Sequence, residues 1–173
     1  MQNSVVQVAQ TIQRPSLAEA MRHSASSIAV VTAGVGREIT GCTVSTAASF
    51  SVDPETMLVS INRRSSTYRA IREHKHFCVN MLAADQVDVA ERFAGRLGTS
   101  GPDRYEGSEW FRLDTGALAL HGALASIDCW LDEVLERHSH AIVLGTVSAI
   151  VVDAALPLTY RLGEYRSFER PGR

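Results

Sequence analysis

The residues best suited to hold a ligand form two clusters that are rich in hydroxyl groups. The first covers residues 40–54 and consists mainly of Thr, Ser, Ala and Gly. Buried hydroxyls need hydrogen-bond partners, so such a run is poor core material and suits a flat polar ligand better. The second covers residues 62–67 and offers hydroxyls, an amide and two arginines, a set that suits a phosphate. Only one apolar segment separates the two clusters, and together they predict a site for a phosphorylated cofactor.

Histidines are the other candidates for chemistry. The pairs His74/His76 and His138/His140 each stand two positions apart, which places both side chains on one face of a strand. Such a pair suits a metal, but no acidic or cysteine ligands at matching spacing accompany it. His140 opens an apolar strand, and the residues alone favour a half-exposed histidine at a strand edge over a functional one.

Three common motifs of nucleotide binding and catalysis are missing. Gly34 and Gly36 lack the third glycine and the following helix of a dinucleotide-binding fingerprint. The glycines of residues 95–101 are not followed by Lys and Ser or Thr, which excludes a P-loop. No serine lies in a nucleophile elbow, which argues against serine hydrolysis.

The elements that position these clusters are mostly strands. We expect strands at 28–32, 38–45, 57–61, 76–82, 123–132, 140–152, 158–160 and 165–168, and short helices at 17–23, around 68–71 and after Asp85 as a cap. Many strands and few helices, without alternation of the two, predict a mainly β antiparallel barrel. Residues 95–107 are predicted to be a long loop without a clear core residue.

Composition favours one ordinary globular domain. The chain has 173 residues and a net charge of -2, which gives no reason to expect nucleic-acid or membrane-surface binding. No apolar run approaches the roughly 20 residues that span a bilayer, and residues 1–15 lack the apolar stretch of a signal peptide. We expect a flexible arm at 1–15 and one domain at 16–173. The cysteines form no C-x-x-C motif and are expected to be reduced in a cytoplasmic protein.

An ordered series of motifs resembles the flavin reductase family with an FMN-binding split barrel. The series comprises GCTVSTAASFSVDP at 41–54, LVSINRRSST at 58–67, FCVNML at 77–82, AERFAG at 90–95, LHGALA at 120–125, HAIVLGTV at 140–147 and PLTYRLGEY at 157–165. The resemblance implies a homodimeric, Greek-key split barrel that transfers a hydride from NADH or NADPH to FMN or FAD. It also implies that the reduced flavin diffuses to a partner monooxygenase.

The resemblance assigns roles to individual residues of this chain. It implies that the flavin ring lies along Thr43, Val44, Ser45 and Thr46, with Ser51 close by. It implies a ribityl and phosphate end held by Asn62, Arg63, Ser65, Ser66 and Thr67, with Phe93 contributing from a following helix. His140 would place the nicotinamide as the catalytic residue, and Tyr165 would close over the same side.

One motif departs from the family pattern. The family often has Gly-Asp-His before its last long strand, whereas this chain has His138-Ser139-His140, so the acid is absent. Two other functions stay open: a flavoprotein that keeps FMN tightly as an electron carrier, and a flavin-binding protein without turnover. The choices between FMN and FAD, and between NADH and NADPH, stay open as well.

Overall fold

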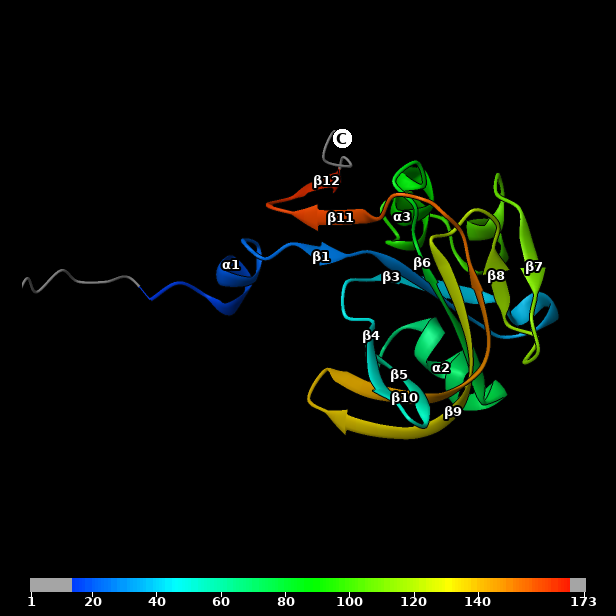
Figure 1. Cartoon of the computed structure of the whole chain (residues 1–173). Helices are drawn as coiled ribbons and strands as arrows, with labels where there is room; N and C mark the ends of the chain where they lie inside the picture. The colour runs from blue at the N-terminus through cyan, green and yellow to red at the C-terminus, as the bar shows by residue number, and fades with distance from the viewer. Residues whose placement is uncertain (1–13, 169–173) are drawn as a thin grey trace, which may run out of the picture.

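The computed structural model describes residues 14–168, which form antiparallel sheets with a few short helices (Figure 1). The main sheet has the strand order β3-β2-β6-β9-β10-β5-β4, and all its pairings are antiparallel. Its strands are β2 (Ala29–Ala33), β3 (Thr40–Val44), β4 (Ala48–Val52), β5 (Glu55–Asn62), β6 (His76–Met81), β9 (Ala125–Arg137) and β10 (His140–Val152). The predicted mainly β antiparallel fold is confirmed.

The main sheet curls until its two ends approach each other without closing. β3 is one edge, and at the other end β5 pairs with the edge strand β4. The two ends meet at Thr46, whose hydroxyl donates to the Ser60 carbonyl at 2.8 Å and lies 3.3 Å from the Ser60 backbone nitrogen. Within residues 14–168 no strand pairing joins β3 to β5. The barrel is therefore split between these strands.

Two apolar clusters hold the strands and helices together. Inside the curled sheet, helix α2 (Ser66–His74) packs Tyr68, Ala70 and Ile71 against β2, β5, β6 and β10. On the other side of β2, helix α3 (Val87–Phe93) buries Val89, Ala90 and Phe93 in a second cluster. β2 is consequently buried on both faces.

Smaller elements surround this framework. Helix α1 (Leu17–Met21) is capped by Ser16, which forms a capping box with Glu19. One small sheet joins β1 (Ser26–Ser27), β11 (Leu158–Arg161) and β12 (Glu164–Ser167), and another joins β7 (Trp110–Arg112) and β8 (Leu118–Leu120). Two 3-10 turns complete the described chain, η1 (Gly36–Glu38) and η2 (Gly101–Tyr105).

Some sequence-based expectations about elements were wrong. The short strands β1, β4, β7 and β8 were not predicted. β4 in particular is exposed along most of its length and lacks the expected apolar alternation. Asp85 does not cap α3, whose preceding residue is Gln86. The Gln86 side chain instead accepts from the Ala83 amide and donates to the His121 carbonyl.

Residues 95–107 do contain a core residue, contrary to the sequence-based expectation. Tyr105 is buried and packs edge-on against Phe93 at 5.0 Å between ring centroids. Its hydroxyl donates to the Thr40 carbonyl at 2.6 Å, and Arg104 donates to the Gly41 carbonyl at 2.6 Å. The segment therefore holds β3 in place.

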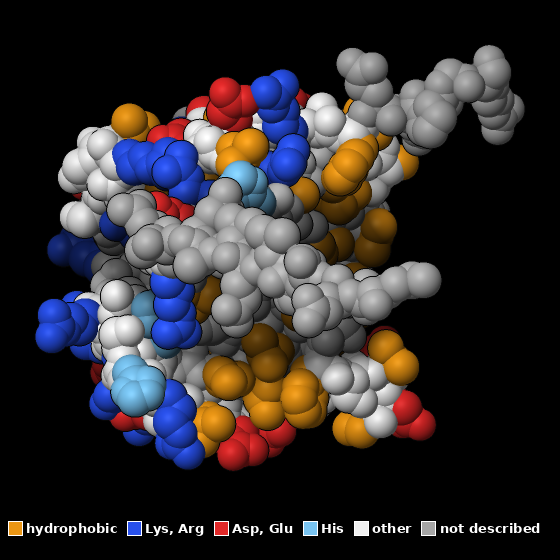
Figure 2. All heavy atoms as spheres, turned by 90° about the vertical axis from the view of Figure 1, so that its left-hand side faces the viewer, with side chains coloured by type: hydrophobic (Ala, Val, Ile, Leu, Met, Phe, Trp, Pro, Cys, Tyr) orange, Lys and Arg blue, Asp and Glu red, His pale blue; other side chains and the backbone are white. Residues whose placement is uncertain are grey.

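Several apolar side chains remain on the surface of the described chain. They lie on β4 and β10 and include Phe50, Val52, Ile150 and Val152, of which Val52 is 82% exposed. Figure 2 shows hydrophobic side chains at the surface on the side of the molecule where β4 lies in Figure 1. The expected arm at residues 1–15 falls almost wholly outside the described residues. Of the helices in 14–168, none is long and apolar enough to cross a membrane.

Candidate functional site

A pocket of about 270 Å³ opens where the barrel is split. It is bordered by the end of β3, the end of β5, the residue before α2 and the start of β10. Its lining residues are Cys42, Thr43, Val44, Ser45, Thr46, Ser60, Ile61, Asn62, Ser65 and His140. The two hydroxyl-rich clusters, which are separate in sequence, thus meet across the split.

The wall formed by β3 is fixed from behind. Gly41 allows Phe93 to pack close, because a Cβ at this position would lie 2.7 Å from the Phe93 ring and 2.8 Å from the Val31 carbonyl oxygen. The Thr43 hydroxyl donates to the Ala90 carbonyl of α3 at 2.6 Å. Since β3 pairs only with β2, the other side of its backbone has no strand partner in the described sheet and faces the split. Backbone N–H groups there suit the polar edge of a flat ring.

The turn between β5 and α2 is built from hydrogen bonds to Asn62. Its carbonyl accepts from the amide and the hydroxyl of Ser65 at 3.0 and 2.8 Å, and its side-chain oxygen accepts from the Arg64 amide at 2.9 Å. The Ser65 oxygen in turn accepts from the Tyr68 amide at 3.1 Å and caps α2. Ser65 thereby presents the start of a helix, with its free N–H groups, to the pocket.

His140 lies at the rim of the pocket, where β10 begins. It pairs with Asn62 of β5 on one side and with Arg137 of β9 on the other. Its Nδ1 lies 2.9 Å from the hydroxyl of Ser139, the residue that stands where the family often has an acid. A hydroxyl can donate to this nitrogen or accept from it, so unlike a carboxylate it imposes no single tautomer.

The structure does not bring all predicted site residues to this pocket. Thr67 and Phe93 are fully buried, and Phe93 supports β3 from behind. Ser51 lies on β4, where its hydroxyl accepts from the Asp53 amide at 3.2 Å. Tyr165 lies on β12, and its hydroxyl donates to Glu91 at 2.6 Å. Arg63 points toward Glu136, with which it forms an ion pair.

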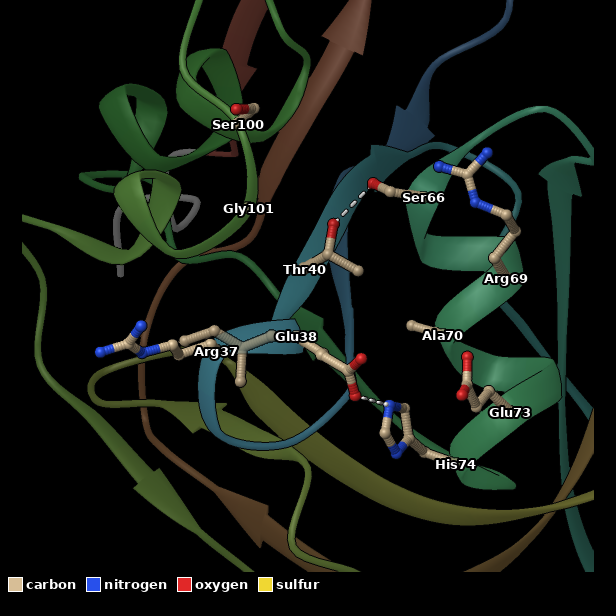
Figure 3. Close-up of a pocket in the computed structure, with 11 residues that line it drawn as sticks. Arg37, Glu38, Thr40, Ser66, Arg69, Ala70, Glu73, His74, Ser100 and Gly101 are labelled. Carbon is tan, nitrogen blue, oxygen red and sulfur yellow. Dashed lines mark hydrogen bonds and ion pairs between the residues drawn. The ribbon is translucent and has the colours of Figure 1, made fainter.

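Ser66 faces a different hollow, which lies beside the same helix (Figure 3). This hollow of about 350 Å³ lies between α2, η1 and the start of η2. The Ser66 hydroxyl lies 2.7 Å from that of Thr40, and His74 lies 3.2 Å from the Glu38 carboxylate across the hollow. The neighbouring residues Ser65 and Ser66 therefore face two separate spaces.

The two side chains of the pair His74/His76 have different partners. His74 faces Glu38, whereas Nδ1 of the buried His76 lies 2.6 Å from the Thr115 carbonyl. Within the described part of the chain no group of three or more His, Cys, Asp and Glu side chains is placed to hold a metal ion.

Sequence reasoning missed three residues of the pocket, Cys42, Ser60 and Ile61. Cys42 lies next to Thr43 on β3 and Ile61 next to Asn62 on β5, while Ser60 lies two positions before Asn62. The curl of the sheet at the split brings all three to the lining. Burial raises the pKa of the Cys42 thiol to about 11, so this side chain is a neutral thiol at neutral pH and not a nucleophile.

Comparison with known proteins identifies the family. The family described as "Flavin reductase like domain" matches residues 21–169. The chain is 36% identical over 154 residues to "FMN reductase (NADH) RutF 2" of Methylorubrum extorquens strain PA1, covering 88% of each protein.

Solved structures agree with this family. BorF, the flavin reductase component of a bacterial two-component tryptophan halogenase, superposes with a TM-score of 0.82 at 29% identity, covering 90% of this chain and 98% of BorF. The NADH:FAD oxidoreductase SgcE6 of Streptomyces globisporus C-1027 also gives a TM-score of 0.82, at 25% identity over 93% of this chain and 96% of SgcE6. The chain belongs to the flavin reductase like family.

Proposed function

We propose that this protein is an NADH-dependent FMN reductase that supplies reduced flavin to a partner monooxygenase. The observation that carries the proposal is the meeting of both hydroxyl-rich clusters and His140 around one pocket at the split of the barrel. The similarity to an NADH-dependent FMN reductase and to a reductase component of a two-component halogenase supports the same reaction.

The pocket residues suit this chemistry because the reaction needs orientation more than acid–base catalysis. NADH supplies a hydride and FMN accepts it, and the protein binds and aligns the two. In this proposal, residues 43–46 hold the flavin ring at the unpaired side of β3. Ser65 and the N–H groups at the start of α2 receive the phosphate end. His140, at the open rim, contacts the nicotinamide.

The remaining predicted residues take different parts in this proposal. Phe93 supports the flavin wall indirectly, and Arg63 acts on the turn before His140, as argued below. Ser66 and Thr67 lie in the first turn of α2 and support the phosphate end through this turn. Ser51 and Tyr165 contact other residues of the chain, and their contribution to cofactor binding stays a prediction.

A charge at Ser66 tests where the phosphate binds. We expect Ser66→Asp to raise the dissociation constant for FMN by about tenfold or more, because a carboxylate at the start of α2 repels the phosphate. An acidic residue in the first turn favours the helix itself, so the thermal midpoint should not fall. Ser66→Ala is the neutral control. Fluorescence titration of FMN measures the effect, and equal affinities for both variants and the parent protein would remove Ser66 from the phosphate region.

We further infer a homodimer. β4 is an edge strand of the main sheet and exposes Phe50 and Val52, which are 61% and 82% exposed. An edge strand with exposed apolar side chains invites pairing with another chain, and a second copy would cover it. Sedimentation should give twice the mass of one chain, and a monomer at micromolar concentration would contradict the inference.

The cysteines bear on the location of the protein. Cys42, Cys78 and Cys129 are all free thiols, which favours the reducing cytoplasm.

The main alternative is a flavoprotein that keeps FMN tightly and serves as an electron carrier. Desalting of the purified protein separates the two functions. A reductase that uses FMN as a substrate loses its flavin on desalting and recovers NADH oxidation in proportion to added FMN. A carrier stays yellow and gains little from added FMN.

A further inference from the structure

The turn that precedes His140 is tied to neighbouring elements by side chains outside the pocket. β9 and β10 form the long hairpin at the lower edge of the molecule in Figure 1, and His138 and Ser139 connect them. His138 has a left-handed backbone with a φ of 50°. Because His140 is the first residue after this turn, the conformation of the turn sets where the imidazole lies.

Arg63 holds the turn from the adjacent strand end. Its amide donates to the Ser139 carbonyl at 3.0 Å, and its guanidinium donates to the His138 carbonyl at 3.1 Å. The same guanidinium forms an ion pair with Glu136, which lies near the end of β9. One arginine thus binds the backbone on both residues of the turn and the strand that leads into it.

Glu136 connects this arginine to helix α2. Tyr68 donates a hydrogen bond to the Glu136 carboxylate, and Arg72 forms an ion pair with it at 3.4 Å. The Tyr68 hydrogen bond, followed by the charges of Arg63 and Arg72, holds the pKa of Glu136 below its ordinary value. The carboxylate is therefore ionised at neutral pH and bridges α2 and the turn.

Glu136 does not touch His140 itself. It pairs across the strands with the buried Ala141, so its side chain lies on the α2 side of the sheet. His140 directly precedes Ala141 on β10 and therefore faces the opposite side of the sheet, where it lines the pocket. Any effect of Glu136 on His140 must pass through the backbone of the turn.

We propose that Glu136 is a positioning residue for His140 and holds the β9–β10 turn against the start of α2 through Arg63. The inference rests on the proposed function, in which His140 contacts the nicotinamide. It also links the two ends of the pocket, because α2 begins at the residues that we assign to the flavin phosphate. The ion pairs are partly exposed and contribute little to stability, so their role is orientation.

Glu136→Gln tests the inference, because it keeps the size of the side chain and removes the charge that holds both arginines. We expect kcat/KM for NADH to fall about three- to tenfold, the scale of one weakened hydrogen bond, with the FMN dissociation constant unchanged. The matched control is Glu133→Gln on the same strand, because Glu133 is exposed and forms no ion pair with residues in the range 14–168. This control should behave like the parent protein.

The double variant Glu136→Gln/His140→Ala separates positioning from general loosening of the structure. If Glu136 acts through His140, adding Glu136→Gln to His140→Ala causes no further loss of kcat/KM for NADH. Losses that multiply, or an unchanged kcat/KM in Glu136→Gln alone, would overturn the inference while leaving the role of His140 intact. An unchanged kcat/KM in His140→Ala alone would instead overturn the role of His140, and the positioning role with it.

Discussion

His140→Ala is expected to lower kcat/KM for NADH about tenfold, the effect of losing roughly one hydrogen bond to the bound ligand. The side chain lies at the open rim of the pocket, beside Asn62 and away from the wall formed by β3. The FMN dissociation constant should therefore stay within about twofold of the parent value, within the usual error of additivity for separate contacts. Steady-state NADH kinetics and FMN titration measure the two effects separately.

Two variants make this expectation specific. His23→Ala removes an exposed histidine that does not line the pocket and should leave both constants unchanged. His140→Gln keeps a hydrogen-bonding side chain and should recover part of the loss. If His140→Ala weakens FMN binding and leaves the use of NADH intact, His140 belongs to the flavin and its assignment to the nicotinamide is wrong.

Asp128→Ala is expected to lower the free energy of unfolding more than the other variants proposed for this protein. The Asp128 side chain is completely buried, and its two oxygens accept from the amide and the hydroxyl of Thr115 at 2.7 and 2.5 Å. The Thr115 carbonyl in turn is hydrogen-bonded to Nδ1 of the buried His76. Removal of the carboxylate leaves two buried donors unpaired, which costs about 2–5 kcal/mol. The thermal midpoint should fall by about 5–15 °C for a chain of this size.

The matched control for this loss is Asp132→Ala, which removes an exposed carboxylate from the same strand and should shift the midpoint by no more than about 2 °C. Asp128→Asn keeps one acceptor oxygen for Thr115 and should lie between the two alanine variants. Equal midpoints for Asp128→Ala and Asp132→Ala would show that the buried pairing contributes nothing to stability.

Local patterns in the sequence predicted much of the fold. β10 was predicted with both of its observed ends, and the helix predicted from Leu17 begins at that residue. β4 was missed because an exposed edge strand made of Ser, Phe and Val carries no core periodicity. Tyr105 was missed because a single aromatic side chain in a Gly- and Pro-rich segment gives no periodic signal.

The sequence predicted which residue types line the candidate site, but only part of their arrangement in space. Both hydroxyl clusters meet at the pocket, as their spacing around one strand suggested. The sequence could not separate Ser65 from Ser66, since only the path of α2 turns one toward the pocket and the other toward the second hollow. The role of Glu136 could not be predicted from the sequence either, because its partners Arg63, Tyr68 and Arg72 come together only in the folded chain.

The most direct test of the proposed reaction is oxidation of NADH by the desalted protein, followed with increasing free FMN and repeated with FAD and with NADPH. The proposed function predicts negligible oxidation without added flavin and rapid oxidation that saturates with FMN. Rapid oxidation with FAD or NADPH would extend the same reaction to those cofactors. Absence of oxidation with every flavin and nicotinamide pairing, in a protein that binds FMN, would contradict the assignment as a reductase.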